Sequence, residues 1–168
     1  PLPAGRRFGR PGGRRVACGP MPTVLVASDA DWVRDQVRAA LVGPGFELIG
    51  VERGRDVRKV VADRKPDLVI VDLQIANMGG MAVALDLRLE ESGGRLPHVP
   101  ILLLLDREAD RFLARRSTAD AMLVKPIDAG TLRRTVKGLL AAEEERKAAE
   151  AATAGPPETT AGPEEEVG

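Results

Sequence analysis

The sequence predicts an α/β fold in which five parallel strands form a doubly wound sheet with helices on both faces. Three observations support this. Short apolar runs alternate with amphipathic segments between residues 23 and 124. The runs at 68–71 and 101–105 are apolar without alternation, as is typical of parallel strands covered on both faces. A repeating strand–helix order with right-handed crossovers then requires a parallel sheet between two helical layers.

The strands are expected where apolar runs of strand length occur. They are Thr23–Ala27, Glu47–Glu52, Asp67–Leu73, Pro100–Leu105 and Ala121–Val124. Helical periodicity fills the intervals, because apolar residues recur there every three or four positions. The first helix is expected to begin at Asp31 and to end at Gly43, the second to end before Pro66, and the third to end at Ser92. The fourth is short and contains Phe112, and the fifth continues to about Ala152.

Charge divides the chain into three parts. The formal net charge is zero, with 25 Lys+Arg and 25 Asp+Glu, but residues 1–20 carry five Arg and no acid. Residues 141–168 carry eight acids and two bases. We therefore expect a disordered basic head at 1–20, one domain at 21–140, and a helical extension followed by a disordered acidic tail at 141–168.

Composition also excludes several classes of protein. Cys18 is the single cysteine, so no intrachain disulfide can form and a structural zinc site is not expected. No apolar stretch reaches the ~18 residues of a membrane span, and the head lacks the apolar core of a signal peptide. The single cysteine and the lack of a signal peptide lead us to expect a cytoplasmic protein. A DNA-binding domain is not expected, because the 28 residues after position 140 are too few for one. The excess of Arg over Lys, 20 to 5, hints at a bacterial genome rich in GC.

Charged side chains follow the strands at the edge of the sheet where ligands bind in doubly wound folds. Asp29 follows the first strand, Asp72 the third and Lys125 the fifth. If the strand order is 2-1-3-4-5, Asp29 faces Asp72. Paired carboxylates with carbonyl oxygens suit Mg²⁺, and Lys125 could balance a phosphate. A carboxylate can also be the nucleophile in phosphoryl transfer, which gives an aspartyl phosphate.

Residues 66–80 resemble the phosphoacceptor segment of the receiver domains of two-component response regulators, and Lys125-Pro126 resembles the lysine–proline pair of that family. The resemblance covers about residues 22–140. It implies a flavodoxin-like fold with strand order 2-1-3-4-5. It also implies that Asp72 is the phosphoacceptor, that Asp29, Asp72 and the Gln74 backbone carbonyl hold Mg²⁺, and that Lys125 contacts the phosphoryl group.

The sequence departs from the family pattern at three positions of the site. Ser28 stands where receivers usually carry the first of two adjacent acids, so weaker metal binding is expected. Leu105 replaces the usual Thr or Ser, whose hydroxyl bonds the phosphoryl group. Met122 replaces the usual switch aromatic. The familiar coupling of a hydroxyl to an aromatic side chain therefore lacks both parts.

Four further residues near the expected site or in loops have simpler interpretations. Asp31 and Asp106 stand at helix starts and are expected to be caps. Trp32 either folds over the mouth of the site or covers the edge of the sheet. His98 is a lone loop histidine for which no metal or catalytic partner is expected.

Two functions remain for such a chain. The first is a single-domain receiver that accepts a phosphoryl group from a histidine kinase or phosphorelay protein and acts on a downstream protein. The second is a pseudo-receiver of the same fold, kept as a phosphorylation-independent binding or dimerisation module, which Ser28, Leu105 and Met122 favour. An enzyme is not expected beyond weak autophosphatase activity, since Gln74 stands where a haloacid-dehalogenase-like phosphatase carries its second acid.

Overall fold

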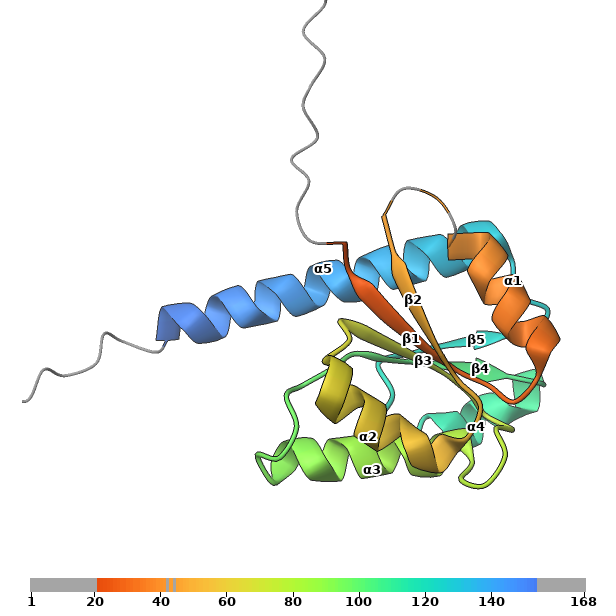
Figure 1. The fold of residues 1–168 in the computed structure, drawn as a ribbon, viewed down its shortest axis with the longest axis horizontal. Coiled ribbons are helices and arrows are strands. Elements are labelled where there is room, and N and C mark those ends of the chain that lie inside the picture. The colour runs from red at the N-terminus through yellow and green to blue at the C-terminus, as the bar shows by residue number, and fades with distance from the viewer. Residues whose placement is uncertain (1–20, 42, 44, 154–168) are drawn as a thin grey trace, which may run out of the picture.

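A computed structural model describes residues 21–41, 43 and 45–153 of the chain (Figure 1). The expected head at 1–20, with Cys18, and the expected tail after Thr153 lie outside the described residues. Five parallel strands form one sheet in the order β2-β1-β3-β4-β5, as the sequence predicts. The strands are β1 (Thr23–Ala27), β2 (Glu47–Val51), β3 (Leu68–Asp72), β4 (Ile101–Leu105) and β5 (Ala121–Val124).

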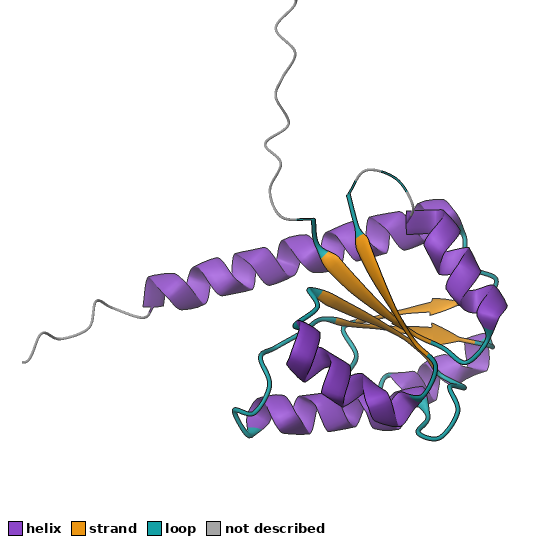
Figure 2. Cartoon of the chain, in the orientation of Figure 1, coloured by secondary structure: helices purple, strands orange, loops and turns teal. Residues whose placement is uncertain are grey.

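Helices cover both faces of the sheet. One face packs against α1 (Asp31–Leu41) and α5 (Ala129–Thr153), and the other against α2 (Gly54–Arg64), α3 (Gly80–Ser92) and the short α4 (Arg111–Ala114), which a 3₁₀ turn, η1 (Glu108–Asp110), precedes (Figures 1 and 2). The second half of α5 extends past the end of the sheet (Figure 1). In the described part of the chain, no helix combines the length and apolarity that a membrane crossing requires.

The side chains of each strand alternate between two separate cores. In β3, Leu68 and Ile70 pack toward α1 and α5, whereas Val69 and Val71 pack toward α2 and α3. The period of two is hidden in the sequence because both faces are apolar. This alternation fixes which residues after each strand point to the α1–α5 side and which point to the α2–α4 side.

Two glycines let the loop after β3 approach its neighbours closely. A Cβ at Gly54 would lie 1.9 Å from the Met78 carbonyl oxygen, and a Cβ at Gly80 would lie 2.5 Å from the Asp72 carbonyl oxygen. The Gly54 backbone N–H donates to the carbonyl of Ala76 at 3.2 Å. These contacts hold the segment 73–79 against the end of β3, where the candidate site lies.

Candidate functional site

Asp72 and Lys125 form a buried ion pair at the carboxyl edge of the sheet. Asp72 is the last residue of β3 and is 2% exposed; Lys125 follows β5, and its side chain is 7% exposed. Lys125 Nζ lies 3.0 Å from Asp72 Oδ1 and 3.2 Å from Oδ2, so the ammonium group donates to both oxygens. The structure therefore brings together the two residues that the sequence predicts as phosphoacceptor and phosphoryl contact.

Asp106 is the second partner of Lys125. Its Oδ1 lies 2.8 Å from Lys125 Nζ, and its side chain is 37% exposed. Burial alone would lower the pKa of Lys125, but hydrogen bonds to Asp106 and Asp72 and the charges of both carboxylates outweigh burial and raise it. Lys125 therefore stays protonated between two carboxylates. The prediction that Asp106 caps a helix is wrong, because its carboxylate turns to Lys125, and Asp110 instead accepts the Arg107 backbone N–H at 3.1 Å.

Ser28, not Asp29, contacts the Asp72 carboxylate. The Ser28 side chain is fully buried, and its hydroxyl donates to Asp72 Oδ2 at 3.0 Å. The same hydroxyl oxygen accepts the Ala30 backbone N–H at 3.2 Å. Asp29 is exposed, and across residues 21–41, 43 and 45–153 its side chain makes no hydrogen bond or ion pair. The expectation that Asp29 faces Asp72 is therefore not met by a direct contact.

A hydrated cation suits the oxygen donors at this edge of the sheet. The carboxylates of Asp72 and Asp29 and the backbone carbonyl of Gln74 are hard oxygen ligands, which Mg²⁺ prefers, and Mg²⁺ usually keeps several waters. Among the described residues, no three His, Cys, Asp or Glu side chains come close enough to hold a metal ion. The Gln74 backbone N–H donates to Asp72 Oδ1 at 3.2 Å, which places this loop residue beside the carboxylate. The donors fit Mg²⁺ with few protein ligands.

Leu105 and Met122 lie on the other side of the sheet. Leu105 is fully buried in the core between the sheet and helices α2 to α4, and Met122 is partly buried against the same core. Neither side chain can supply a hydroxyl to a group bound at Asp72. The folded site therefore lacks a hydroxyl at position 105 and an aromatic ring at position 122, as the sequence indicates.

Trp32 lies at the mouth of the site. Lys125 Nζ lies 5.5 Å from the centroid of the Trp32 ring, which is a cation–π distance. The indole is 56% exposed, so it borders the site and remains open to solvent. Of the two interpretations of Trp32, the structure therefore supports the one in which its side chain lies over the mouth of the site.

Asp31 is the first residue of α1, and its side chain pairs with Arg34. The prediction that its side chain caps the helix is wrong.

A period of two links the residues that meet here. Ser28, Asp72, Asp106 and Lys125 each continue the alternation of their strand on the α1–α5 side, after Val26, Ile70, Leu104 and Leu123 respectively. Leu105 continues the opposite alternation, and its side chain enters the other core. The sequence did not predict the contacts of Ser28 and Asp106, because this alternation is hidden where both faces of a strand are apolar.

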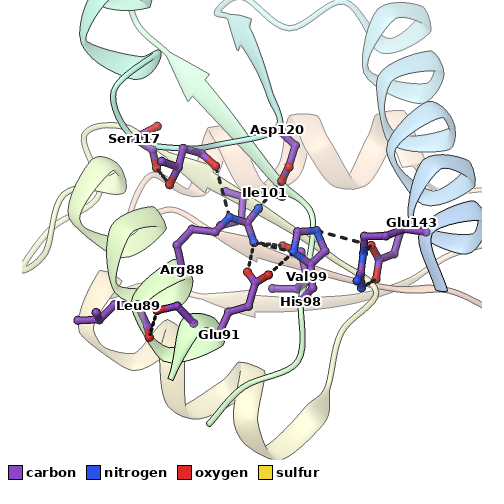
Figure 3. Close-up of polar contacts among 12 residues, drawn as sticks. Arg88, Leu89, Glu91, His98, Val99, Ile101, Ser117, Asp120 and Glu143 are labelled. Atoms are coloured by element: carbon purple, nitrogen blue, oxygen red, sulfur yellow. Dashed lines mark hydrogen bonds and ion pairs between the residues drawn. The ribbon is translucent and has the colours of Figure 1, made fainter. Parts of the chain in front are cut away.

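A second polar cluster lies at the opposite edge of the sheet, near the starts of β4 and β5 (Figure 3). His98 Nδ1 lies 2.7 Å from Glu91 Oε1, and Nε2 lies 3.6 Å from Oε2 of the buried Glu143 on α5. Arg88 binds Asp120 at 2.6 Å and the Val99 carbonyl at 3.0 Å. His98 therefore has two acidic neighbours that its loop sequence does not reveal. The cluster joins α3 to α5.

Comparisons with known proteins agree with this architecture. A family model of the response regulator receiver domain matches residues 24–137. Protein PilH of Pseudomonas aeruginosa is 27% identical over 121 residues, which cover 72% of this chain and 99% of PilH. The transcriptional regulatory proteins KdpE of Escherichia coli and AfsQ1 of Streptomyces coelicolor are 33% and 27% identical over 67% and 71% of this chain. The chain spans only about half the length of these two regulators, 48% and 52%.

Solved structures share the fold. The chemotaxis response regulator CheY4 of Vibrio cholerae is similar with a TM-score of 0.62 and 24% identity, over 71% of this chain and 98% of that one. The receiver domain of the sensor histidine kinase PA1611 of Pseudomonas aeruginosa is similar with a TM-score of 0.64 and 20% identity, over 72% of this chain and 98% of that one. That structure is described with a magnesium ion in its active site cleft. With the family model matching most of the chain, the fold and the sequence agree: the chain belongs to the response regulator receiver domain family.

Proposed function

We propose that this chain is a phosphoacceptor module that takes a phosphoryl group onto Asp72 with Mg²⁺ as cofactor. In this proposal the donor is the phosphohistidine of a histidine kinase or phosphorelay protein, and the phosphorylated chain signals through contacts with another protein. The observation that supports it most strongly is the buried Asp72 carboxylate with Lys125 Nζ at 3.0 and 3.2 Å. A carboxylate and a protonated amine at one sheet edge suit the acceptance of a dianionic group.

The chemistry at Asp72 is a nucleophilic displacement at phosphorus. One carboxylate oxygen attacks the phosphorus atom, the P–N bond of the phosphohistidine breaks, and the imidazole nitrogen keeps the electron pair and takes up a proton. The product is an acyl phosphate whose phosphoryl oxygens carry two negative charges. Lys125 stabilises this charge, because its raised pKa keeps the ammonium group protonated.

Three oxygen donors at this edge of the sheet define the cofactor position in this proposal. Asp72, Asp29 and the Gln74 backbone carbonyl would hold Mg²⁺. Bound there, Mg²⁺ would reduce the repulsion between the carboxylate and the incoming phosphoryl group. With Ser28 in place of an acid, one negative charge fewer lies beside Asp72, and we expect weak affinity.

Phosphorylation by a small donor tests this proposal. The chain is incubated with acetyl phosphate and Mg²⁺, and its intact mass is measured. We expect the mass gain of one phosphoryl group in the wild type and none in Asp72→Asn or in the presence of a chelator. No gain in the wild type, or the same gain in Asp72→Asn, would contradict the proposal.

A phosphorylation-independent binding module is the second candidate. It is favoured by the ion pair between Asp106 and Lys125, which occupies the lysine, and by Leu105, which offers no hydroxyl. Titration with Mg²⁺ followed by Trp32 fluorescence separates the two functions, because Trp32 lies over Lys125. A response at millimolar Mg²⁺ that Asp29→Ala abolishes favours the phosphoacceptor, and no response favours the binding module.

A further inference from the structure

The start of the segment after β4 carries a carboxylate that competes for the site's lysine. Asp106 Oδ1 is 2.8 Å from Lys125 Nζ, at least as close as either oxygen of Asp72, at 3.0 and 3.2 Å. Two carboxylates therefore share one ammonium group, and these three side chains together carry one net negative charge. Neither carboxylate has Lys125 to itself.

A phosphoryl group on Asp72 would change this balance. The Asp72 carboxylate carries one negative charge, whereas its acyl phosphate carries two, so the negative charge beside Lys125 increases by one. Asp106 and the phosphoryl group then repel each other at the same time as both attract Lys125. Because Asp106 is partly exposed and the phosphoryl group is bonded to a buried residue, Asp106 is the partner that can leave for water.

Asp106 is also well placed to pass this change on. It lies two residues before η1, which leads into α4, and the surface of α4 includes Phe112, 69% exposed, and Leu113, 47% exposed. We propose, on the basis of the proposed phosphoacceptor function, that Asp106 is a positioning residue that holds Lys125 before phosphorylation and releases it to the phosphoryl group, freeing the η1–α4 segment. In this role Asp106 takes the place of the hydroxyl and aromatic switch residues, whose positions are held by Leu105 and Met122.

Two measurements test the role of Asp106. First, its negative charge slows phosphorylation of Asp72, so Asp106→Asn and Asp106→Ala accept phosphate from acetyl phosphate about tenfold faster or more than the wild type, while Asp106→Glu stays within about threefold. Second, the ion pair restrains the following segment. Amide hydrogen exchange at 107–116 in unphosphorylated Asp106→Asn therefore resembles that of the phosphorylated wild type, faster than in the unphosphorylated wild type.

A matched control removes the same charge without touching Lys125. Glu108 lies two residues further on and pairs with Arg111. Glu108→Gln should keep the wild-type phosphorylation rate within about twofold and the wild-type exchange of β4 and β5. Circular dichroism and thermal melts of every variant show that the comparison is made between folded proteins.

The outcomes separate the two proposals. If the wild type is labelled and Asp106→Asn is labelled no faster, or if exchange at 107–116 is unchanged in Asp106→Asn, the role of Asp106 is overturned and the phosphoacceptor function stands. If Glu108→Gln accelerates labelling as much as Asp106→Asn, the effect is general electrostatics and the role of Asp106 is again overturned. If no variant is labelled, the proposed function itself fails, and the role of Asp106 fails with it.

Discussion

Ser28→Asp restores the acid that the family usually carries beside the phosphoacceptor. The Ser28 side chain is fully buried, and its hydroxyl lies 3.0 Å from Asp72 Oδ2. An aspartate here would place a second carboxylate next to Asp72. Two unit charges about 4 Å apart repel by about 4 kcal/mol at an effective dielectric constant of about 20. Without metal, we therefore expect this variant to unfold more easily than the wild type, with up to about 4 kcal/mol lower free energy of unfolding.

Mg²⁺ should reverse this loss. A divalent ion about 5 Å from the added carboxylate, with one water between them, is attracted to it by about 1.7 kcal/mol even at the dielectric constant of water. This attraction corresponds to a more than tenfold higher affinity for Mg²⁺. Titration by Trp32 fluorescence gives the dissociation constant, and thermal melts with and without Mg²⁺ give the stability. Ser28→Asn, which has a similar shape and no charge, is the control.

The result that would refute this reasoning is specific. If Ser28→Asp binds Mg²⁺ no more tightly than Ser28→Asn, the metal does not lie beside Asp72 and Ser28. The Mg²⁺ positions proposed for Asp29 and Gln74 would then be wrong as well.

Three further predictions concern stability. Gly54→Ala should cost about 1–3 kcal/mol or more by denaturant unfolding, because its Cβ would lie 1.9 Å from the Met78 carbonyl oxygen; an unchanged midpoint would contradict this. Leu103→Ala, fully buried, should cost about 2–5 kcal/mol in the same assay, and less than about 1 kcal/mol would refute the core assignment. Burial raises the pKa of Glu143, but Arg146, His98 and Lys147 outweigh burial and lower it below 4.5. Its contribution is therefore complete above pH 4.5 and lost as pH falls further. Unfolding at a series of pH values should show that Glu143→Gln costs about 1–3 kcal/mol at pH 7 and progressively less below pH 4.5; a cost that does not change with pH would contradict this.

Much of the fold could be predicted from apolar runs and breakers. The runs at 68–71 and 101–105 are long enough to be strands and too short for core helices, and both became central strands. The meeting of Asp72 and Lys125 followed from the rule that the carboxyl ends of parallel strands share one edge. These features depend on backbone topology, which the order of elements determines.

The remaining site contacts depend on side-chain direction, which apolar runs do not reveal. Asp106-Arg107-Glu108 has the composition of a helix start, yet the ammonium group of Lys125 provides a stronger partner for Asp106 than a backbone N–H. Ser28 continues the alternation of β1 and reaches Asp72, whereas the neighbouring Asp29 is exposed and makes no direct contact with Asp72. His98 meets Glu143 of α5, which lies 45 residues further along the chain. Each depends on tertiary packing between segments distant in sequence.

The central claim is that Asp72 becomes an acyl phosphate, and mapping the modified residue tests it most directly. The chain is treated with acetyl phosphate and Mg²⁺, reduced with borohydride, which converts an aspartyl phosphate to homoserine, and digested for peptide mass spectrometry. The account predicts homoserine at position 72 and at no other aspartate. Homoserine at another position such as Asp29 or Asp106, or its complete absence, would contradict the account.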